Sequence, residues 1–563
     1  MTGSPVRPPT LALFAEWTAE RYTSHPALRF RSGNGWTTET YEDLRTTVRH
    51  LGRALLSRGL RPGDRIAILA ETSPQWTHTH LACLAAGAVV VPIYPTAGEE
   101  EVKWVLKDSG ARFALYESEE QADRLEALRP ELPGLEAVWS LKGRGELRDQ
   151  PKTARSRTTT HPAQPTHPAQ PASLDHLLAT ANAVRPEDTA TLVYTSGTTG
   201  PPKGCRLTHG NLGAVQDATL PLTEGGPGDR TYLYLPLAHL LAQLIQFSTL
   251  LYGGELCYFG GRVEDIVAEL AEARPTHLPS VPRLFEKVHQ GVLSLAEQLH
   301  VTDEKELSDL VRAAFGGNLR WALTGGAPIA PETLDFLRAG GIQVFEGYGM
   351  TESAGVITLN HPGAVRHGTV GRPIDGCEVR IAEDGEVLAR GANVFPGYHA
   401  NPTGTAEALD GDGWLHTGDL GALDADGYLT ITGRKKDLII TSAGKNLAPS
   451  EVELAIERSR FVSHAVMVGD RRPYPVALIT VDAAEVAGKD AAAVRALVQE
   501  AVDAANARVS RPARIRAFAV LDEDFTVESG VLTPTQKVRR RAVTERYAQE
   551  IERLYEIAQK AQA

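Results

Sequence analysis

The chain has 563 residues, and 58 lysines and arginines against 70 aspartates and glutamates give a formal net charge of −12. This length allows about three to five structural units. The acidic balance argues against a nucleic-acid binder that works through a broad basic surface. Four scattered cysteines without paired spacing predict neither a disulfide framework nor a zinc site. With no secretory signal pattern at the N-terminus, we expect a cytoplasmic protein.

The first part of the chain alternates helical and strand patterns. The sequence predicts a helix over Tyr41–Arg58 that Gly59 ends, then a turn at residues 62–64 and a strand over Arg65–Leu69. Val89–Ile93 is a short, continuously apolar run, which is typical of a strand buried on both faces. Such alternation predicts an α/β fold in which helices cover parallel sheets.

Residues 142–171 have a different composition. They are polar and proline-rich, and they repeat Thr-His-Pro-Ala-Gln-Pro in tandem at Thr160–Pro165 and Thr166–Pro171. Such a segment cannot bury enough apolar area to offset its ordering entropy. We therefore predict an extended surface insertion, in preference to a metal site built on its histidines.

A glycine-rich loop predicts a phosphate-binding site. The expected strand Thr189–Tyr194 runs into Thr195–Gly204, where glycines admit an anion to backbone N–H groups and Lys203 adds positive charge. The glycines are too close together for a Walker A loop, and prolines precede the lysine. A helix directly follows a Walker A loop. Here an extended segment at Cys205–Leu207 comes first, and a helix capped by Thr208 follows it. The loop indicates a polyphosphate ligand, outside the P-loop class.

Thr231–Gly254 contains no acidic residue, lysine or arginine. Its length alone would span a bilayer, but proline, histidine and glutamine residues interrupt it. We therefore predict a buried helix that lines an apolar cavity, in preference to a membrane span.

Later segments predict two further units. Between Gly371 and Thr432, short strands joined by Asp-Gly turns indicate a small antiparallel β unit. After it, strands are expected at Ala465–Val468 and Val476–Val481 and a helix at Ala491–Ser510. This helix has a core-facing stripe of Val494, Leu497, Val498, Ala501 and Val502. The last part is therefore predicted to be a compact α+β domain.

Five motifs, in order and at matching spacing, resemble the adenylate-forming (acyl-activating) superfamily. The resemblance implies an N-terminal body of two doubly wound α/β subdomains and a small β subdomain, followed by a mobile α+β C-terminal domain. The implied domains are 1–434 and 435–563, with Lys436 as the hinge. The motifs are Tyr194–Gly204, Tyr348–Glu352, Trp414–Asp419, Gly433–Asp437 and Leu532–Lys537.

Within the superfamily, the chain most resembles the long-chain fatty acid–CoA ligases. The segments that carry this resemblance are Leu235–His239, Pro275–Leu284 and Ser442–Asn446. The resemblance implies ATP, Mg²⁺ and coenzyme A: a carboxylate attacks the α-phosphate, and the CoA thiol then displaces AMP. The alternatives are a fatty acyl-AMP ligase that delivers to a carrier protein, a medium-chain or aryl acid–CoA ligase, and a non-catalytic lipid-binding protein. The expected partners are a fatty acid and CoA, without nucleic acid; peripheral contact with the inner face of the membrane and a homodimer are further expectations.

The resemblance also implies residue roles. Lys537 would bridge the carboxylate and the α-phosphate, Glu352 and Thr195 would hold Mg²⁺, and His239 would lie near the carboxylate or the thiol entrance of an acyl pocket. Residues 232–251 and Val281–Phe285 are candidate linings of that pocket. Asp419 is expected to accept hydrogen bonds from the ribose hydroxyls, and Arg434 to donate to the ribose or the α-phosphate. The Tyr348 ring is expected to stack on the adenine. The full set of predicted nucleotide-binding residues is Thr195, Ser196, Gly197, Thr198, Thr199, Gly200, Lys203, Gly326, Ala327, Pro328, Glu346, Gly347, Tyr348, Gly349, Met350, Thr351, Asp419, Arg434 and Lys537.

Overall fold

A computed structural model describes residues 7–33, 35–141, 148–149, 172–195, 201–261, 265–533 and 537–560. The chain divides into two compact units. The first holds most of the chain up to His416, and the second holds Arg380–Leu388 and Thr417–Ala563. The predicted loop residues Ser196, Gly197, Thr198, Thr199 and Gly200 lie outside the described residues, as does the proline-rich insertion except for Arg148–Asp149.

One large sheet of the first unit has seven strands in the order β7-β6-β5-β3-β4-β8-β9. Its inner neighbours, from β6 to β8, are parallel, and the two edge strands β7 and β9 pair antiparallel. The predicted strands at 65–69 and 89–93 are confirmed, and every residue of β4 is buried. The strands are β3 (Arg65–Leu69), β4 (Val89–Ile93), β5 (Phe113–Tyr116), β6 (Ala137–Ser140), β7 (Arg148–Asp149), β8 (Thr189–Thr195) and β9 (Lys203–Thr208).

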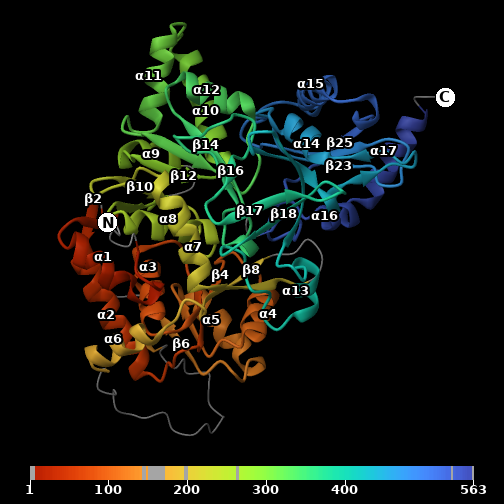
Figure 1. The fold of residues 1–563 in the computed structure, drawn as a ribbon. Helices are drawn as coiled ribbons and strands as arrows, with labels where there is room; N and C mark the ends of the chain where they lie inside the picture. The colour runs from red at the N-terminus through yellow and green to blue at the C-terminus, as the bar shows by residue number, and fades with distance from the viewer. Residues whose placement is uncertain are drawn as a thin grey trace. The chain divides into compact units, whose positions relative to one another are not determined.

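Helices cover both faces of this sheet because its apolar side chains alternate between them. Ile66 and Ile68 belong to the core that includes residues of α2 (Tyr41–Ser57) and α3 (Pro74–Ala85). Ala67 and Leu69 face the opposite core, with α4 (Glu99–Ser109) and α5 (Glu119–Leu128). This doubly wound arrangement is the predicted one (Figure 1).

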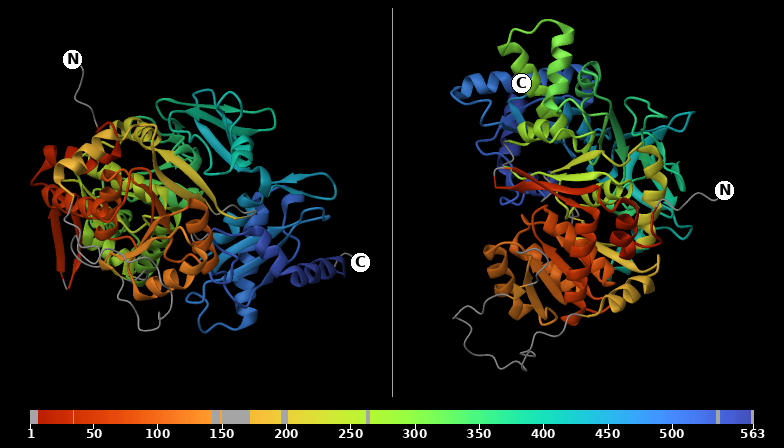
Figure 2. Two further views of the ribbon diagram at one scale, coloured as in Figure 1. Left: turned by 90° about the horizontal axis from the view of Figure 1, so that it is seen from below. Right: turned by 90° about the vertical axis from the view of Figure 1, so that its left-hand side faces the viewer.

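The second large sheet has nine strands in the order β16-β15-β14-β13-β12-β10-β11-β1-β2. The strands from β14 to β1 run parallel. Figure 2 shows the N-terminal hairpin β1–β2, in red, beside the yellow-green strands of this sheet. The strands are β1 (Pro26–Ser32), β2 (Gly35–Thr40), β10 (Arg230–Leu233), β11 (Glu255–Tyr258), β12 (His277–Ser280), β13 (Trp321–Thr324), β14 (Val344–Tyr348), β15 (Thr358–Leu359) and β16 (Arg372–Pro373).

Helices also lie on both faces of the nine-stranded sheet. On one face, α7 (His209–Thr219) and α8 (Leu240–Leu251) share the core of α2 and α3, so this helical layer serves both sheets. The first turn of α7 is capped by Thr208, as predicted. The other face carries α9 (Ile266–Ala273), α10 (Pro282–Gln298), α11 (Glu304–Ala314) and α12 (Pro331–Ala339). The remaining helices of the unit are α1 (Phe14–Tyr22), α6 (Leu174–Ala183) and α13 (Pro402–Ala408).

Helix α8 confirms the buried helix predicted within the uncharged segment 231–254. Gln243 and Gln246 are fully buried. Gln243 Nε2 donates to the Leu237 carbonyl at 3.0 Å, and Gln246 Nε2 lies 3.1 Å from His80 Nδ1, which gives the nitrogen of each buried amide a partner. Among the helices that the structure describes, none is long and apolar enough to cross a membrane.

A four-stranded sheet in the order β17-β18-β19-β20 confirms the predicted antiparallel β unit. Its strands are β17 (Cys377–Ile381), β18 (Glu386–Gly391), β19 (Leu415–Leu423) and β20 (Leu429–Arg434). The predicted Asp-Gly turns fall between its strands, at residues 384–385 and 426–427.

The rest of the second unit is built on the three-stranded sheet β23-β24-β25. Two helices pack on each face (Figure 1). The strand at 476–481 is confirmed; in the predicted stripe, Val498, Ala501 and Val502 are buried, whereas Val494 and Leu497 are half-buried. The elements are β21 (Ile439–Ile440), β22 (Asn446–Leu447), α14 (Pro449–Glu457), β23 (Val462–Val468), β24 (Val476–Val481), α15 (Ala491–Arg508), β25 (Phe518–Val520), α16 (Arg540–Arg546) and α17 (Ala548–Lys560).

Candidate active site

The strands β8 and β9 hold the two ends of the predicted phosphate loop. Thr195, the last residue of β8, pairs with Lys203, the first residue of β9. Thr195 Oγ1 donates to the Lys203 carbonyl at 3.5 Å. The hydroxyl and the ammonium predicted to contact phosphate are therefore neighbours across one strand pair.

Glu352 is a buried carboxylate next to this strand pair. It lies in the short 3₁₀ helix Thr351–Ser353, which follows β14, and is 7% exposed. The Tyr398 hydroxyl donates to Glu352 Oε1 at 2.7 Å, and the Phe395 N–H donates to the Glu352 carbonyl at 2.8 Å. Burial of a carboxylate requires such partners, because an unpaired buried charge is strongly destabilising.

The Cys205 thiol links the two predicted metal ligands. It is buried, and the side chains of both Thr195 and Glu352 lie near enough to influence its titration. Burial, and then the negative charge of Glu352, raise the pKa of the Cys205 thiol well above its ordinary value. The thiol is therefore protonated at neutral pH, and Thr195 and Glu352 belong to one cluster of polar side chains.

This cluster fits Mg²⁺ that arrives with a polyphosphate. Among the described residues, no group of three or more His, Cys, Asp or Glu side chains could hold a metal ion. Mg²⁺ is commonly held by one or two carboxylates together with substrate phosphates and water. One buried carboxylate and one hydroxyl are therefore a suitable donor set for Mg²⁺ bound to ATP, and an unsuitable one for a metal held by protein alone.

The segments predicted to bind adenine come together at the ends of two parallel strands. β13 and β14 pair with Thr324 opposite Glu346, so the turn that contains Gly326, Ala327 and Pro328 lies beside Gly347 and Tyr348. Gly326 has φ +80°, which favours glycine. Ligands of open α/β sheets bind at such carboxyl ends.

Gly349 allows the chain after β14 to turn back on itself. A Cβ atom at Gly349 would lie 2.4 Å from the Gly355 carbonyl oxygen, which is backbone and cannot move aside. Only glycine fits there, and the close approach positions Met350, Thr351 and Glu352. The glycine of this motif is thus explained by packing next to the site.

Glu346 is the carboxyl group with the most perturbed titration in this region. Burial raises the pKa of Glu346 to about 7, although the Gly368 N–H hydrogen-bonds the carboxylate. At neutral pH its protonated form is therefore well populated, and this side chain is suited to donate as well as accept a hydrogen bond.

In the second unit, Asp419 and Arg434 form a cross-strand ion pair. They are partners in the β19–β20 register, and Arg434 Nε donates to Asp419 Oδ1 at 2.6 Å. Asp419 is 5% exposed. Next to them, Lys435 Nζ donates to Asp384 Oδ2 at 2.7 Å and to Glu386 Oε2 at 3.0 Å. The structure therefore brings the two predicted ribose-binding residues together.

The hinge and lysine candidates lie in exposed segments of the second unit. Lys436 is exposed within the 3₁₀ helix Lys435–Asp437. Lys537 is also exposed; its N–H donates to Thr533 Oγ1 at 3.0 Å, and its carbonyl accepts from the Thr533 N–H at 2.8 Å. These backbone bonds fix the Lys537 main chain, and the catalytic role of its ammonium group stays a prediction.

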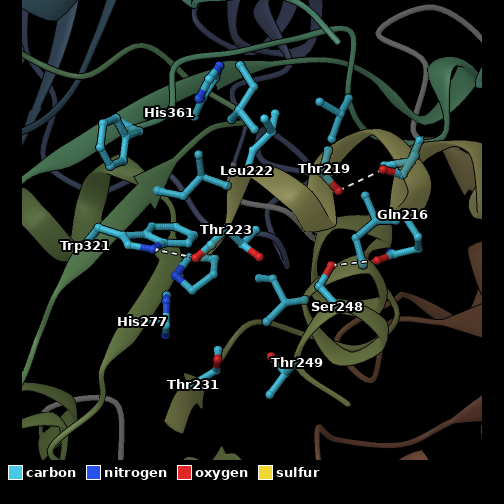
Figure 3. A pocket seen from close by; sticks show the side chains of 18 of the residues that line it. Gln216, Thr219, Leu222, Thr223, Thr231, Ser248, Thr249, His277, Trp321 and His361 are labelled. Atoms are coloured by element: carbon cyan, nitrogen blue, oxygen red, sulfur yellow. Dashed lines mark hydrogen bonds between the residues drawn. The ribbon is translucent and has the colours of Figure 1, made fainter. Parts of the chain in front are cut away.

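The first unit contains a cavity of about 80 Å³. Apolar side chains from α7, α8 and the strands β12 to β14 form most of its walls (Figure 3). The segment predicted at 232–251 contributes Leu241, Leu244, Ile245, Ser248 and Thr249 to the lining. The other lining residues are Val215, Gln216, Thr219, Leu222, Thr223, Thr231, Tyr252, His277, Pro279, Trp321, Leu323, Phe345, Val356, Leu359, Asn360, His361 and Pro362.

Two predictions about an acyl pocket do not apply to this cavity. Val281–Phe285 lie outside its lining: Leu284 and Phe285 are buried in the core on the other side of the nine-stranded sheet, because α10 turns them there. His239 is also absent from the lining. Its ring caps α8, with Nδ1 accepting from the Leu241 N–H at 3.1 Å.

The polar groups of the cavity wall bond mainly to one another. Ser248 Oγ donates to Gln216 Oε1 at 2.9 Å, and Trp321 Nε1 donates to the Thr223 carbonyl at 2.9 Å (Figure 3). Burial lowers the pKa of His277 to about 4, so this ring is neutral at pH 7. The cavity therefore presents a mostly apolar, uncharged surface, which suits a hydrocarbon chain.

Tyr398 and Cys205 are contacts of the site that sequence patterns did not identify. Tyr398 lies 46 residues from the carboxylate it bonds, outside the motifs that carry the resemblance. The Gly-Tyr pair at 397–398 has no distinctive spacing, so only the tertiary structure identifies it.

Solved structures share this fold. The o-succinylbenzoate CoA synthetase of Bacillus subtilis, in complex with its acyl-adenylate intermediate, superposes with a TM-score of 0.72 at 24% identity, over 95% of this chain and 97% of that one. The adenylation domain of a Mycobacterium chelonae carboxylate reductase superposes with a TM-score of 0.79 at 23% identity, over 98% of this chain and 92% of that one. The fold is thus that of the adenylate-forming enzymes.

Family models and relatives are more specific. The model described as AMP-binding enzyme matches residues 15–399, and that of the AMP-binding enzyme C-terminal domain matches residues 436–559. The chain belongs to the AMP-binding enzyme family. The long-chain-fatty-acid–CoA ligase FadD15 of Mycobacterium bovis is 38% identical over 92% of both chains. The peroxisomal long chain acyl-CoA synthetase 7 of Arabidopsis thaliana is 31% identical over 92% of this chain and 81% of that one.

Proposed function

We propose that this protein is an ATP-dependent long-chain fatty acid–CoA ligase. The observation that carries the proposal is the 38% identity, over 92% of both chains, to a protein named as such a ligase, and the apolar, uncharged cavity of the first unit supports it. Each buried CH₂ group contributes about 0.8 kcal/mol. A hydrocarbon chain therefore binds apolar walls more tightly as more of its length is buried.

In the first half-reaction, a carboxylate oxygen of the acid attacks the α-phosphorus of ATP, and pyrophosphate leaves with the electron pair. Catalysis of such a step depends on positioning and on electrostatic stabilisation. Lys203 and Thr195 bind the β- and γ-phosphates, and Asp419 with Arg434 holds the ribose. Glu352 and Thr195 would hold Mg²⁺, which would supply positive charge to the phosphates.

In the second half-reaction, the CoA thiol attacks the acyl carbon, and AMP leaves as the thioester forms. Lys537 acts before this step, on the carboxylate and α-phosphate oxygens. Two half-reactions around one adenylate need different groups, so domain 435–563 moves about Lys436 between them. Glu346–Thr351, with Gly326–Pro328, would contact the adenine. A cytoplasmic location, contact with the membrane surface and a homodimer belong to the same proposal.

An assay with ATP, Mg²⁺, palmitate and CoA tests the function. We expect palmitoyl-CoA, AMP and pyrophosphate in equal amounts. Accumulation of palmitoyl-AMP without the thioester would indicate a fatty acyl-AMP ligase instead. Absence of ATP–pyrophosphate exchange with every carboxylate tried would indicate a lipid-binding protein without this activity.

A further inference from the structure

We propose that Tyr398 is a positioning residue that orients the Glu352 carboxylate for the metal and supports Lys203 on the phosphates. This inference rests on the proposed function, because it assumes that Thr195, Lys203 and Glu352 bind Mg²⁺·ATP. The Tyr398 side chain contacts both charged residues of this set, Glu352 and Lys203.

The first contact is the hydrogen bond to the carboxylate. The Tyr398 hydroxyl donates to Glu352 Oε1 at 2.7 Å. The terminal torsion of a glutamate side chain is broad and has no sharp preference of its own. A bond at Oε1 therefore fixes the plane of the carboxylate and the direction of Oε2. Hydrogen-bonding partners behind a metal ligand commonly set its orientation in this way.

The second contact is with the lysine of the phosphate loop. Lys203 Nζ lies 5.1 Å from the centroid of the Tyr398 ring, within the range of a cation–π interaction. This ammonium also lies 3.9 Å from the Glu407 carboxylate, and the Glu407 side chain is 70% exposed. A solvent-exposed ion pair contributes little, so the tyrosine ring is the better-defined support for the lysine.

The backbone of Tyr398 is itself held in place, which makes these contacts reproducible. Tyr398 forms a β-bridge with Cys205 of β9, and the His399 N–H donates to the Gly204 carbonyl at 2.8 Å. Its own N–H donates to Thr405 Oγ1 at 2.9 Å. The tyrosine thus extends from a segment attached to the same strand that carries Lys203.

Substitution of Tyr398 separates the two contacts. Tyr398→Phe removes the hydroxyl and keeps the ring, whereas Tyr398→Leu removes both. Tyr194→Phe is a matched control. Tyr194 lies in the neighbouring strand β8, and its hydroxyl donates to Asp108 Oδ2 at 2.7 Å, the same length as the bond from Tyr398 to Glu352. This substitution removes an equivalent tyrosine–carboxylate bond, to Asp108 in place of Glu352.

The measurement is the dissociation constant of ATP by calorimetry on the full chain, once with Mg²⁺ and once with EDTA. The ratio of the two constants isolates the contribution of the metal. We expect Tyr398→Phe to reduce that ratio about tenfold or more and to leave the EDTA constant unchanged. Tyr398→Leu should reduce the ratio similarly and also weaken binding in EDTA, about twofold to fivefold. Tyr194→Phe should change neither constant.

An unchanged ratio in Tyr398→Phe would overturn the assignment, as would equal weakening in both arms, because a merely structural loss would act on both. Mn²⁺ paramagnetic resonance with ATP adds a readout independent of affinity: we expect the line shape of the bound ion to change in Tyr398→Phe and to stay unchanged in Tyr194→Phe. If the unsubstituted protein itself shows no metal-dependent ATP binding, the proposed function fails, which is a distinct outcome.

Discussion

Glu352 and Lys537 are predicted to serve the same adenylation step, but their local settings differ. Glu352 is 7% exposed and is bonded through its side chain to Tyr398 and through its carbonyl to Phe395. Lys537 is exposed, and its backbone N–H and carbonyl are hydrogen-bonded to Thr533. One group is held by a packed core, and the other is presented on a surface turn.

This difference indicates that the two units contribute in different ways. In the first unit, the Glu352 carboxylate, the Thr195 hydroxyl and the cavity are fixed by the fold, so the entropy cost of ordering them is part of folding. The second unit presents an exposed cationic side chain, Lys537, whose proposed partners are the reacting groups. We therefore expect substitutions in the second unit to separate the half-reactions, and substitutions in the first unit to affect both.

The largest expected effect is that of Lys537→Ala. Loss of a donor that acts only in the transition state typically lowers the rate about 10²–10³-fold. We expect this loss in ATP–pyrophosphate exchange, while thioester formation from supplied acyl-AMP stays close to normal. Rapid-quench measurement of each half-reaction checks this, and equal loss in both would contradict the role of Lys537.

A smaller effect is expected for Lys436→Pro. Proline fixes φ near −65° and removes the N–H, so it restricts the torsions that a hinge must change. Thioester formation should fall about tenfold or more, whereas adenylation should fall much less. Lys435→Ala, which changes the neighbouring side chain without fixing the backbone, is the comparison. If thioester formation is unaffected in Lys436→Pro, the assignment of Lys436 as the hinge is wrong.

In the first unit, Ile245→Trp tests whether the cavity holds the acyl chain. Ile245 lines the cavity from α8, so a larger ring there takes up space that the distal carbons need. If two methylene groups are excluded, the preference for palmitate over octanoate should fall about tenfold, in both half-reactions. The octanoate rate of the same variant controls for misfolding. A preference that does not change would place the acyl chain elsewhere.

The smallest effect concerns acid sensitivity of the first unit. Burial lowers the pKa of His80 to about 3 and of His209 to about 4. Each is therefore neutral when folded, while the unfolded chain takes up a proton below about pH 6.5. Their contribution to stability is fully present above that pH and is lost as the pH falls towards 4.

We therefore expect the melting temperature to fall between pH 7.5 and pH 5.5, and His80→Gln to show a fall about 2 °C smaller. Differential scanning calorimetry at both pH values measures this. His25→Gln, at an exposed histidine, should show the fall of the unsubstituted protein. An equal fall in His80→Gln would contradict the buried, neutral state of His80.

Strands with uninterrupted apolar runs and clear turn signals were predictable from the sequence. The bounds of β3, β4 and β24 agree with expectation because each run is short, buried and flanked by glycine, proline or charged residues. The helix α8 was predictable for a similar reason: twelve residues without a charge cannot face water along their length. Local composition decides such elements.

Features that depend on tertiary contacts were not predictable. Glu352 meets Tyr398 only because the segment after β18 returns to β9, and no local pattern encodes this return. Likewise, Leu284 and Phe285 join the core on the other face of the nine-stranded sheet, whereas Val281 packs against the core of α7 and α8, and apolar composition alone did not predict this division. The grouping of Thr195, Cys205 and Glu352 also follows from the packing of three separate segments.

The most direct test of the central claim is the rate of acyl-CoA formation as a function of acid chain length, from butyrate to palmitate. The uncharged cavity predicts that kcat/KM rises with length, by up to about fourfold per methylene until the cavity is filled, with AMP and pyrophosphate formed in step. A profile that is flat, or that is highest for a short or aromatic acid, would contradict the assignment as a long-chain fatty acid–CoA ligase.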